Sequence, residues 1–152
     1  YCGCPLSKIK ERLKCIDLPE RRLAISNSLR GSILIDDSYN SNPASLKNAV
    51  DSLEGLNRKK ICILGDMKEL GSDSQKIHQE MYEYISERVD QIFCIGDEWS
   101  TCSPNKKQDL SIFENQDDLY SHLISIINKK TIILVKGSRS TRMDLLADRL
   151  KE

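Results

Sequence analysis

Three short polar segments of this sequence carry the residue types from which a binding site could be built. They are DDSYNSNP at residues 36–43, GDMKELG at residues 65–71 and KGSR at residues 136–139. Each one directly follows an apolar run that is typical of a strand buried on both faces of a parallel sheet. Because parallel strands end at the same edge of a sheet, we expect the three segments to form one composite site.

The chemistry that these residue types suit is the recognition of anions and hydroxyl groups. A carboxylate such as that of Asp37 can accept hydrogen bonds from two hydroxyl groups at once. Lys136 and Arg139 place two positive charges close together, and Gly137 would let the backbone approach a ligand. A helix that begins at Ser140 would direct its free N–H groups at the same anion. Residues 136–139 are therefore predicted to hold an anionic group.

The same residues also admit structural interpretations. Arg139 could pair with Asp144 or Asp148 on the last helix, with Lys136 left in solvent. Asp37 could belong to a turn or cap a helix. Asn42 is a good helix N-cap, and that role could be the whole explanation for its presence.

The elements that would position these segments alternate between strand and helix. Apolar runs predict core strands at residues 33–35, 60–64, 91–95, 110–113 and 131–135. Helical spacing predicts helices after residues 42 and 72 and over residues 117–128 and 140–150. Residues 21–35 are expected to form a hairpin that leads into the first core strand. Parallel neighbours require crossover connections and helices supply them. The fold class is therefore α/β: a Rossmann-like, doubly wound, mostly parallel sheet with an N-terminal β-hairpin.

Two of the predicted helices begin with capping signals. Asn42 and Pro43 suit the N-cap and the first helical position. The inward face of that helix would then carry Leu46, Ala49, Val50 and Leu53. Ser72 and Gln75 resemble a capping box for the next helix. Its inward face would carry Ile77, Met81, Tyr84 and Ile85.

Composition argues against two classes of partner. Lys and Arg together number 23, as do Asp and Glu, so no net positive field would attract nucleic acid or an anionic membrane. No apolar run approaches the roughly 20 residues that a membrane-spanning helix needs. We therefore expect no membrane insertion and a cytoplasmic location.

Cysteine and nucleotide-binding motifs narrow the chemistry further. The six cysteines are expected to be free thiols, because Cys62 and Cys94 lie inside apolar strand-like runs. No metal site is expected, since the CGC motif at residues 2–4 lacks a second ligand pair and His78 and His122 fall in separate helices. The dinucleotide fingerprint GxGxxG and the phosphate loop GxxxxGK[ST] are both absent from the sequence. The chain could not, by itself, hold a nucleotide triphosphate in a phosphate loop.

The three polar segments and their flanks resemble the C-terminal domain of the Mur ligases, and within that family the MurF type. The resemblance is carried, in the family's order, by ILIDDSYNSNPASLKNAVDSL, ILGDMKELGSDSQKIHQE and ILVKGSRSTRM. It covers nearly the whole chain from about residue 18. It implies that residues 19–152 are the Mur ligase C-terminal domain. Residues 1–18, which begin without an initiator Met, would be the tail of the preceding central ATPase domain or a linker.

The resemblance implies an ATP-dependent ligase of peptidoglycan precursor synthesis. In that reaction ATP phosphorylates the carboxylate of UDP-N-acetylmuramoyl-tripeptide, and the amine of D-alanyl-D-alanine attacks the acyl phosphate to give an amide. The N-terminal and central domains, the latter with the phosphate loop and most ligands of Mg²⁺, would lie outside this chain. The present domain would close on ATP and position the dipeptide. No catalytic residue is expected in it, and the isolated fragment should be inactive.

Roles for individual residues also follow from the resemblance. The ATP contacts would be made by Arg21 at the phosphates, by Asp37 at the ribose hydroxyls, and by Asp66 of the GDM motif. The amine substrate would be contacted by Asn40, Ser41, Asn42, Lys136, Ser138 and Arg139, with KGSR as the anchor for the dipeptide carboxylate. Lys68 and His78 are left undecided, because a lone helical histidine is more often a packing residue than a catalyst.

Two alternatives stay open. One is a sister ligase of the same family that adds a different amino acid or a polyglutamate tail, although DDSYN together with GDMKELG argues against it. The other is a non-catalytic module that binds a nucleotide or a peptide at the same edge of the sheet. A phosphate-loop sequence upstream of Tyr1 would favour the ligase over the module.

Overall fold

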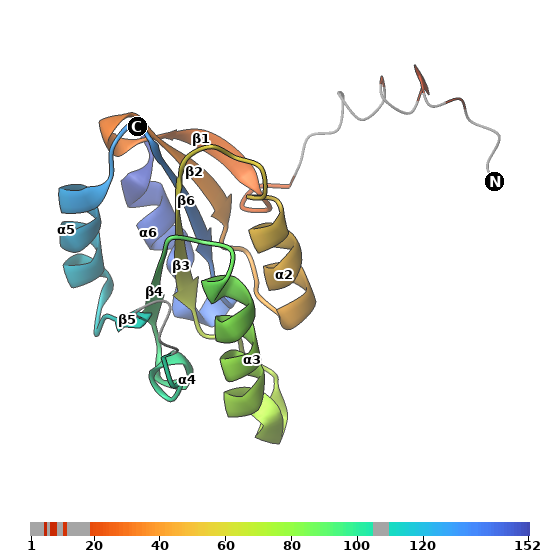
Figure 1. Cartoon of the computed structure of the whole chain (residues 1–152), viewed down its shortest axis with the longest axis vertical. Coiled ribbons are helices and arrows are strands. Elements are labelled where there is room, and N and C mark those ends of the chain that lie inside the picture. Colours follow the sequence, from red (N-terminus) through yellow and green to blue (C-terminus); the bar gives the residue numbers. More distant parts are fainter. Residues whose placement is uncertain (1–4, 6, 9–10, 12–18, 105–109) are drawn as a thin grey trace.

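The computed structural model describes residues 5, 7–8, 11, 19–104 and 110–152, and the predicted strands assemble into one six-stranded sheet (Figure 1). Along the chain the strands are β1 (Ala24–Ser28), β2 (Ser32–Asp37), β3 (Lys59–Gly65), β4 (Gln91–Ile95), β5 (Leu110–Ile112) and β6 (Thr131–Lys136). Their order in the sheet is β1-β2-β6-β3-β4-β5. Strand β1 pairs with β2 antiparallel, and the other pairs are parallel. The α/β fold class and the N-terminal hairpin are thereby confirmed.

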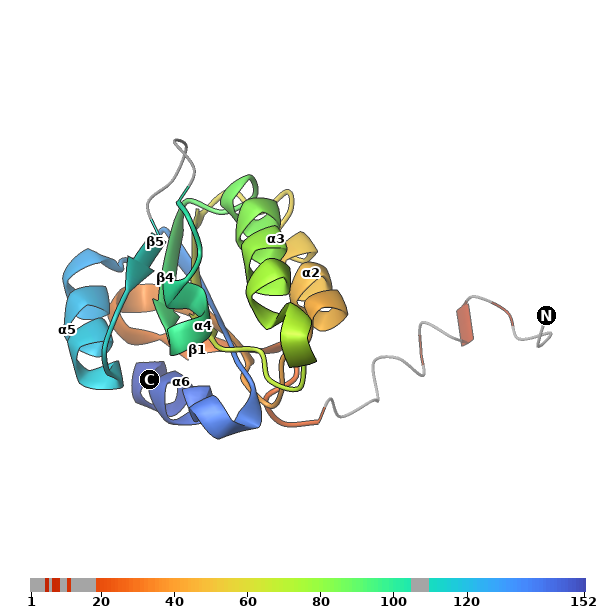
Figure 2. The ribbon, with the colours of Figure 1, turned by 90° about the horizontal axis from the view of Figure 1, so that it is seen from below.

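Helices cover both faces of the sheet (Figure 2). They are α2 (Pro43–Asp51), α3 (Ser74–Ser86), α4 (Asp97–Ser100), α5 (Gln116–Ile126) and α6 (Met143–Leu150). Helices α2, α3 and α4 pack on one face, and α5 and α6 on the other. Short 3₁₀ turns occur at Leu29–Gly31, Gly71–Asp73 and Arg139–Thr141.

The strands are apolar almost throughout because both of their faces are buried. Along β6, Ile132 and Leu134 face the core under α2 and α3, whereas Ile133 and Val135 face the core under α5 and α6. Helix α2 begins as predicted, with Asn42 as N-cap and Pro43 at its first position. All four of its predicted inward residues are buried.

The sheet order brings the three polar segments together. Strand β6 lies between β2 and β3, so KGSR emerges between DDSYNSNP and GDMKELG. The register pairs Asp37 of β2 with Lys136 of β6 and Leu64 of β3 with the same lysine. All three strands run in the same direction, and their carboxyl ends therefore share one edge, as predicted.

Two local predictions are wrong. The last helix does not begin at Ser140: a 3₁₀ turn comes first, Arg142 has a left-handed φ of 51°, and α6 starts at Met143. The capping box of Ser72 and Gln75 does not form, because the turn at Gly71–Asp73 leads directly into α3 and its N-cap makes no side-chain hydrogen bond. The predictions for residues 1–18 fall almost entirely outside the described residues.

No helix in the described part of the chain is both long enough and apolar enough to span a bilayer.

Candidate functional site

Two adjoining hollows lie over the carboxyl edge of the sheet. The first, which we call the arginine hollow, has a volume of about 650 Å³. It is lined by Pro19, Glu20, Arg21, Arg22, Ser38, Tyr39, Arg139, Arg142 and Asp144. The second, which we call the loop hollow, has a volume of about 560 Å³. It is lined by Tyr39, Asn40, Ser41, Asn42, Lys68, Glu69, Leu70, Ser138, Arg139 and Ser140. Tyr39 and Arg139 belong to both.

The arginine hollow carries an excess of positive charge. Its lining holds four arginines against two acidic residues, Glu20 and Asp144. The guanidinium carbons of Arg22 and Arg139 lie 4.5 and 5.6 Å from the centre of the Tyr39 ring. Stacking on an aromatic ring leaves the edge of a guanidinium free to donate hydrogen bonds. The hollow is therefore suited to a group with several anionic oxygens.

Arg139 is free to meet a ligand. The alternative in which it pairs with Asp144 or Asp148 is wrong, since Asp144 pairs with Arg142 and Asp148 with Arg21 and Lys151. Apart from its contact with Tyr39, the Arg139 side chain has no hydrogen bond or ion pair within residues 19–104 and 110–152.

Lys136 is buried below the hollows. Its side chain is 2% exposed, and its ammonium donates to Asp37 Oδ2 at 2.5 Å and to the Asn40 carbonyl at 2.9 Å. The other carboxylate oxygen of Asp37 accepts the Leu23 N–H at 3.1 Å. Both oxygens that would bind ribose hydroxyls thus have partners within the domain. The alternative in which Lys136 is left in solvent is wrong, because the β2–β6 register places an acid beside it.

Ser138 ties two of the polar segments together. Its N–H donates to the Asp66 carbonyl at 3.1 Å, and its Oγ accepts the Lys68 N–H at 2.8 Å. The hydroxyl hydrogen is not used by these two bonds and could be donated to a ligand. Asn42, by contrast, uses its side-chain oxygen to accept the Ser45 N–H in a reciprocal capping box.

Asp66 lies beneath the GDM turn, outside the lining of both hollows. It is 3% exposed, and its Oδ2 lies 2.9 Å from Lys68 Nζ. The hydrogen bond to Asp66 raises the pKa of Lys68. Among the described residues the buried Oδ1 atom has no hydrogen-bond partner, and it packs against Gly96, where any Cβ would come within 2.2 Å of it. Gly96 therefore leaves room for this carboxylate.

His78 is a packing residue that supports the GDMKELG segment. Its Nε2 accepts the Met67 N–H at 3.1 Å, and its Nδ1 lies 2.8 Å from the Ser74 carbonyl. The tautomer with the proton on Nδ1 satisfies both contacts. The ring is fully buried and meets Trp99 edge-on, with 4.7 Å between ring centroids.

Gly137 serves packing rather than close approach by a ligand. A Cβ at this position would lie 2.6 Å from Met143 Cγ and 2.6 Å from Thr141 Oγ1. The side chains that follow KGSR therefore occupy the space above the glycine. The prediction that Gly137 admits a ligand is corrected accordingly.

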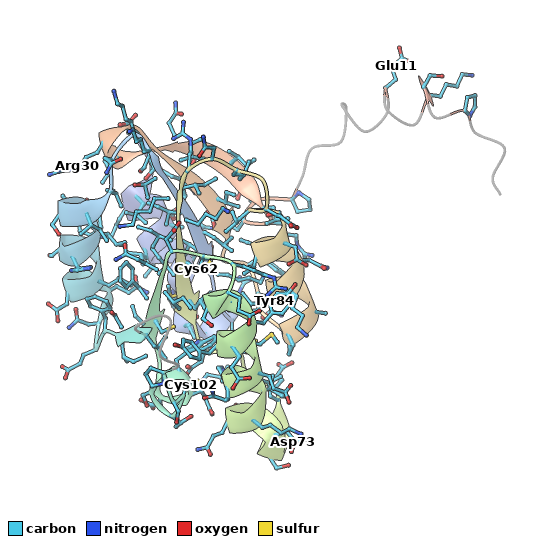
Figure 3. The ribbon with its side chains drawn as sticks, in the orientation of Figure 1. Glu11, Arg30, Cys62, Asp73, Tyr84 and Cys102 are labelled. Carbon is cyan, nitrogen blue, oxygen red and sulfur yellow. The ribbon has the colours of Figure 1, made fainter. Side chains whose placement is uncertain are left out.

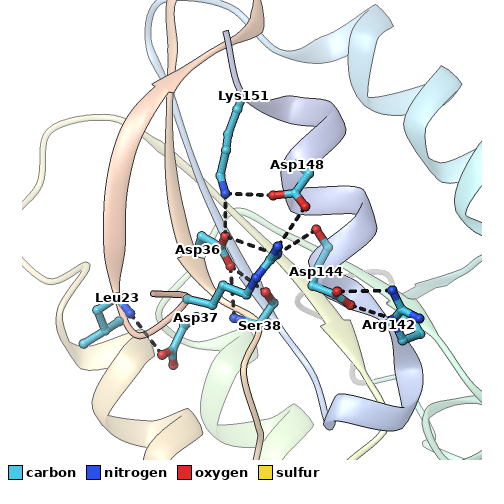
Figure 4. Close-up of polar contacts among 9 residues, drawn as sticks. Leu23, Asp36, Asp37, Ser38, Arg142, Asp144, Asp148 and Lys151 are labelled. Carbon is cyan, nitrogen blue, oxygen red and sulfur yellow. Dashed lines mark hydrogen bonds and ion pairs between the residues drawn. The ribbon is translucent and has the colours of Figure 1, made fainter. Parts of the chain in front are cut away.

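An ion-pair cluster, not predicted from the sequence, joins the two ends of the described domain (Figure 4). Asp36 is 1% exposed, accepts from Ser38 Oγ at 2.6 Å and lies 3.0 Å from Lys151 Nζ. Lys151 also lies 2.9 Å from Asp148, which in turn pairs with Arg21 at 2.8 Å. The Arg21 hydrogen bond lowers the pKa of Asp148. Burial alone would lower the pKa of Lys151, but its bonds to Asp148 and Asp36 raise it overall.

The described cysteines carry free thiols and are buried. Cys62 lies within β3 and Cys102 follows α4 (Figure 3). Burial raises the pKa of Cys62 to about 12 and that of Cys102 to about 11, so neither is an activated nucleophile. Among the described residues no group of three or more His, Cys, Asp or Glu side chains could hold a metal ion.

Comparison with known proteins gives consistent matches. Residues 21–139 match the family model described as "Mur ligase, glutamate ligase domain". A UDP-N-acetylmuramoyl-tripeptide–D-alanyl-D-alanine ligase of Buchnera aphidicola is 39% identical, over 97% of this chain and 33% of the relative. The Haemophilus influenzae protein of the same name is 32% identical, over 99% of this chain and 34% of the relative. The chain thus spans about a third of the length of the curated relatives it matches.

Comparison with solved structures agrees with the family match. A MurF structure from Acinetobacter baumannii superposes with a TM-score of 0.80 at 30% identity, over 97% of this chain and 33% of that one. A Thermotoga maritima MurF ligase in complex with ADP gives a TM-score of 0.78 at 24% identity, over 88% of this chain and 31% of that one. At that identity the second likeness concerns the fold alone.

Proposed function

Because this chain belongs to the Mur ligase family, we propose that it is the C-terminal domain of the ligase that adds D-alanyl-D-alanine to UDP-N-acetylmuramoyl-tripeptide. One observation carries the proposal: relatives that are 32–39% identical over nearly the whole chain bear that name. The activity would belong to a longer protein, in which N-terminal and central domains precede this one. We place the reaction in the cytoplasm, where ATP is available.

ATP would supply the phosphoryl group that activates the tripeptide carboxylate. The arginine hollow fits its phosphates, because guanidinium groups offer several donors to anionic oxygens. We assign Arg21 to this contact. We also assign Asp37 and Asp66 to the nucleotide; in this structure Asp37 binds Lys136 and Asp66 binds Lys68. We propose that Mg²⁺ is held mainly by the central domain.

The loop hollow would receive the dipeptide. Asn40, Ser41 and Ser138 offer amide and hydroxyl groups along its wall, and Arg139 offers a cation that forms no ion pair within the described residues. We assign the dipeptide carboxylate to Arg139. Lys136 would act indirectly, by holding Asp37 and the Asn40 carbonyl in place, and Asn42 by capping α2. The amine would then point towards the arginine hollow, where the activated carboxylate is formed.

A ligation assay on the full-length protein tests this function. With ATP, UDP-N-acetylmuramoyl-tripeptide and D-alanyl-D-alanine, we expect release of ADP and phosphate together with the UDP-linked pentapeptide, detected by mass spectrometry. Single amino acids, including glutamate, serve as competing amine donors. Preferential ligation of one of those, or of glutamate to a folate, would assign the protein to a sister ligase instead.

A further inference from the structure

The last helix holds the guanidinium of Arg21 in one orientation. Arg21 donates to Asp148 Oδ2 at 2.8 Å and to the Asp144 carbonyl at 3.1 Å. Asp148 is thereby the only carboxylate within hydrogen-bond distance of Arg21 in the described residues, since Asp36 lies 3.9 Å away. These contacts join the segment before β1 to α6, across more than 120 positions of sequence (Figure 4).

The held guanidinium still has donors to offer. An arginine has five N–H donors. The two contacts to α6 use two of them, so three have no hydrogen-bond partner in the described part of the chain. The side chain is 28% exposed and lines the arginine hollow. Arg21 is therefore fixed at one side and open at the other, which is the arrangement of a pre-oriented anion ligand.

Without Asp148 the orientation of Arg21 would be poorly defined. An unanchored arginine samples many rotamers, and ordering it on a ligand costs conformational entropy. Asp148 is itself fixed, because Lys151 lies 2.9 Å from its other oxygen and 3.0 Å from buried Asp36. Asp148 does not line either hollow. Asp148 could therefore affect a ligand in the hollow only indirectly, through Arg21.

We propose that Asp148 is a positioning residue for phosphate recognition, which orients the Arg21 guanidinium toward the arginine hollow. The proposal rests on the proposed function only in naming ATP as the anion that matters to the enzyme. The proposal predicts the opposite effect on anion binding from the one expected of the Asp148 charge alone. Loss of a negative charge beside a basic hollow should tighten anion binding, whereas loss of a positioning contact should weaken it.

The test measures anion binding and catalysis in parallel. In this chain, calorimetric titration with inorganic tripolyphosphate should show a dissociation constant about five-fold weaker for Asp148→Ala than for the unmodified protein, with partial recovery in Asp148→Glu. In the full-length ligase, Asp148→Ala should raise the KM for ATP by a similar factor and leave the KM for D-alanyl-D-alanine unchanged. In an Arg21→Ala background the second change should add nothing, because the two residues act as one unit.

Asp117→Ala is the matched control. It removes the carboxylate that pairs with Arg149 at 2.7 Å, also on α6 but outside both hollows. Tripolyphosphate affinity that is unchanged or tighter in Asp148→Ala, with Arg21→Ala still weakening it, would overturn the positioning role and leave Arg21 as a ligand. Unchanged tripolyphosphate affinity in Arg21→Ala would overturn both the positioning role of Asp148 and the role of Arg21 as a phosphate ligand. Failure of the ligation assay with the tripolyphosphate result intact would overturn the enzyme assignment alone.

Discussion

Lys136 is nearly fully buried, yet its ammonium faces a carboxylate and a carbonyl rather than an apolar core. The pair with Asp37 links the neighbouring strands β2 and β6 at the point where both strands end. Each charge makes the other tolerable inside the protein, because an isolated buried charge is very costly. The position of the DDSYN loop therefore depends on this pair, since the same ammonium also binds the Asn40 carbonyl.

We predict that Lys136→Met lowers the free energy of unfolding of this chain by about 3–5 kcal/mol, the usual cost of removing one partner of a buried ion pair. Urea denaturation followed by circular dichroism measures the change. The control is Lys76→Met, since the Lys76 side chain is 77% exposed and its pair with Glu80 spans 3.9 Å. An exposed pair of that kind contributes at most about 1 kcal/mol. Equal losses in the two variants would contradict the structural role of the Lys136–Asp37 pair.

Arg139 illustrates a different kind of residue, whose charge has no partner within the described domain. We predict that Arg139→Ala in the full-length enzyme raises the KM for D-alanyl-D-alanine about ten-fold or more. The reason is the loss of a charged hydrogen bond of roughly 1.5–3 kcal/mol. The KM for ATP should change little.

Steady-state kinetics with each substrate varied in turn measures the effect. Arg149→Ala is the control, because Arg149 stacks on Tyr120 and pairs with Asp117 away from both hollows. If Arg139→Ala kept the dipeptide KM and lost ATP affinity, this arginine would belong to the nucleotide, in line with its place on the wall that the two hollows share.

At the scale of elements, local sequence patterns located the strands well. The predicted strand at residues 91–95 coincides with β4, and the core strands β3 and β6 extend one residue or so beyond prediction. Apolar runs were sufficient because each core strand is buried on both faces. The break before α6 leaves no local pattern, and a residue from another element meets it: the side-chain amide of Gln116 donates to the Arg142 carbonyl at 3.0 Å. That contact spans 26 residues and stabilises a left-handed Arg142.

The same limit applied to the site. Sequence reasoning found the three segments, because they follow from strand ends, but it left open whether Arg139 pairs with an acid of the last helix. It missed the partners of Asp36 and Arg21, which come from the last helix. Pairings between the beginning and the end of a chain leave no local pattern, so the sequence suggested Asp148 only as a partner of Arg139 and did not suggest Lys151.

The docking of α6 should depend on acidity through Asp148. Its pKa is lowered from the ordinary value of 3.8, first by the Arg21 hydrogen bond and also by Lys151. A lowered folded-state pKa means that the contribution to stability is present above pH 3.8 and is lost as the pH falls through the folded-state value. We therefore predict that Asp148→Asn destabilises the chain at pH 7, and that the difference narrows below about pH 4.

Thermal unfolding of the two proteins at pH 7, 5 and 3 measures this narrowing. Asp117→Asn supplies the comparison, because its pair with Arg149 lies on the exposed side of α6. A difference between wild type and Asp148→Asn that stayed constant down to pH 3 would show that the side chain acts through packing or neutral hydrogen bonds.

At the scale of the whole molecule, the sheet gathers donors and positive charge at one edge but leaves the chemistry incomplete. The two hollows open on the surface and share a wall made by Tyr39 and Arg139. A phosphoryl group bound in the arginine hollow and an amine bound in the loop hollow would therefore lie next to each other, near Tyr39 and Arg139. The sequence contains no phosphate loop, and in the relatives this chain corresponds to about a third of the length. The proposed function therefore requires a neighbouring ATP-binding domain to complete the site.

This division of labour gives the last prediction. The 152-residue chain should fold by itself, because its two hydrophobic cores lie on the two faces of one sheet and are both formed within the described residues. It should nevertheless neither hydrolyse ATP nor ligate D-alanyl-D-alanine, since arginines can bind phosphates but do not replace a phosphate loop with its metal ion. Purified chain and full-length protein would be compared by phosphate release at equal concentration. Steady turnover by the chain, above buffer and abolished by Asp37→Ala, would mean that this domain carries catalytic groups of its own.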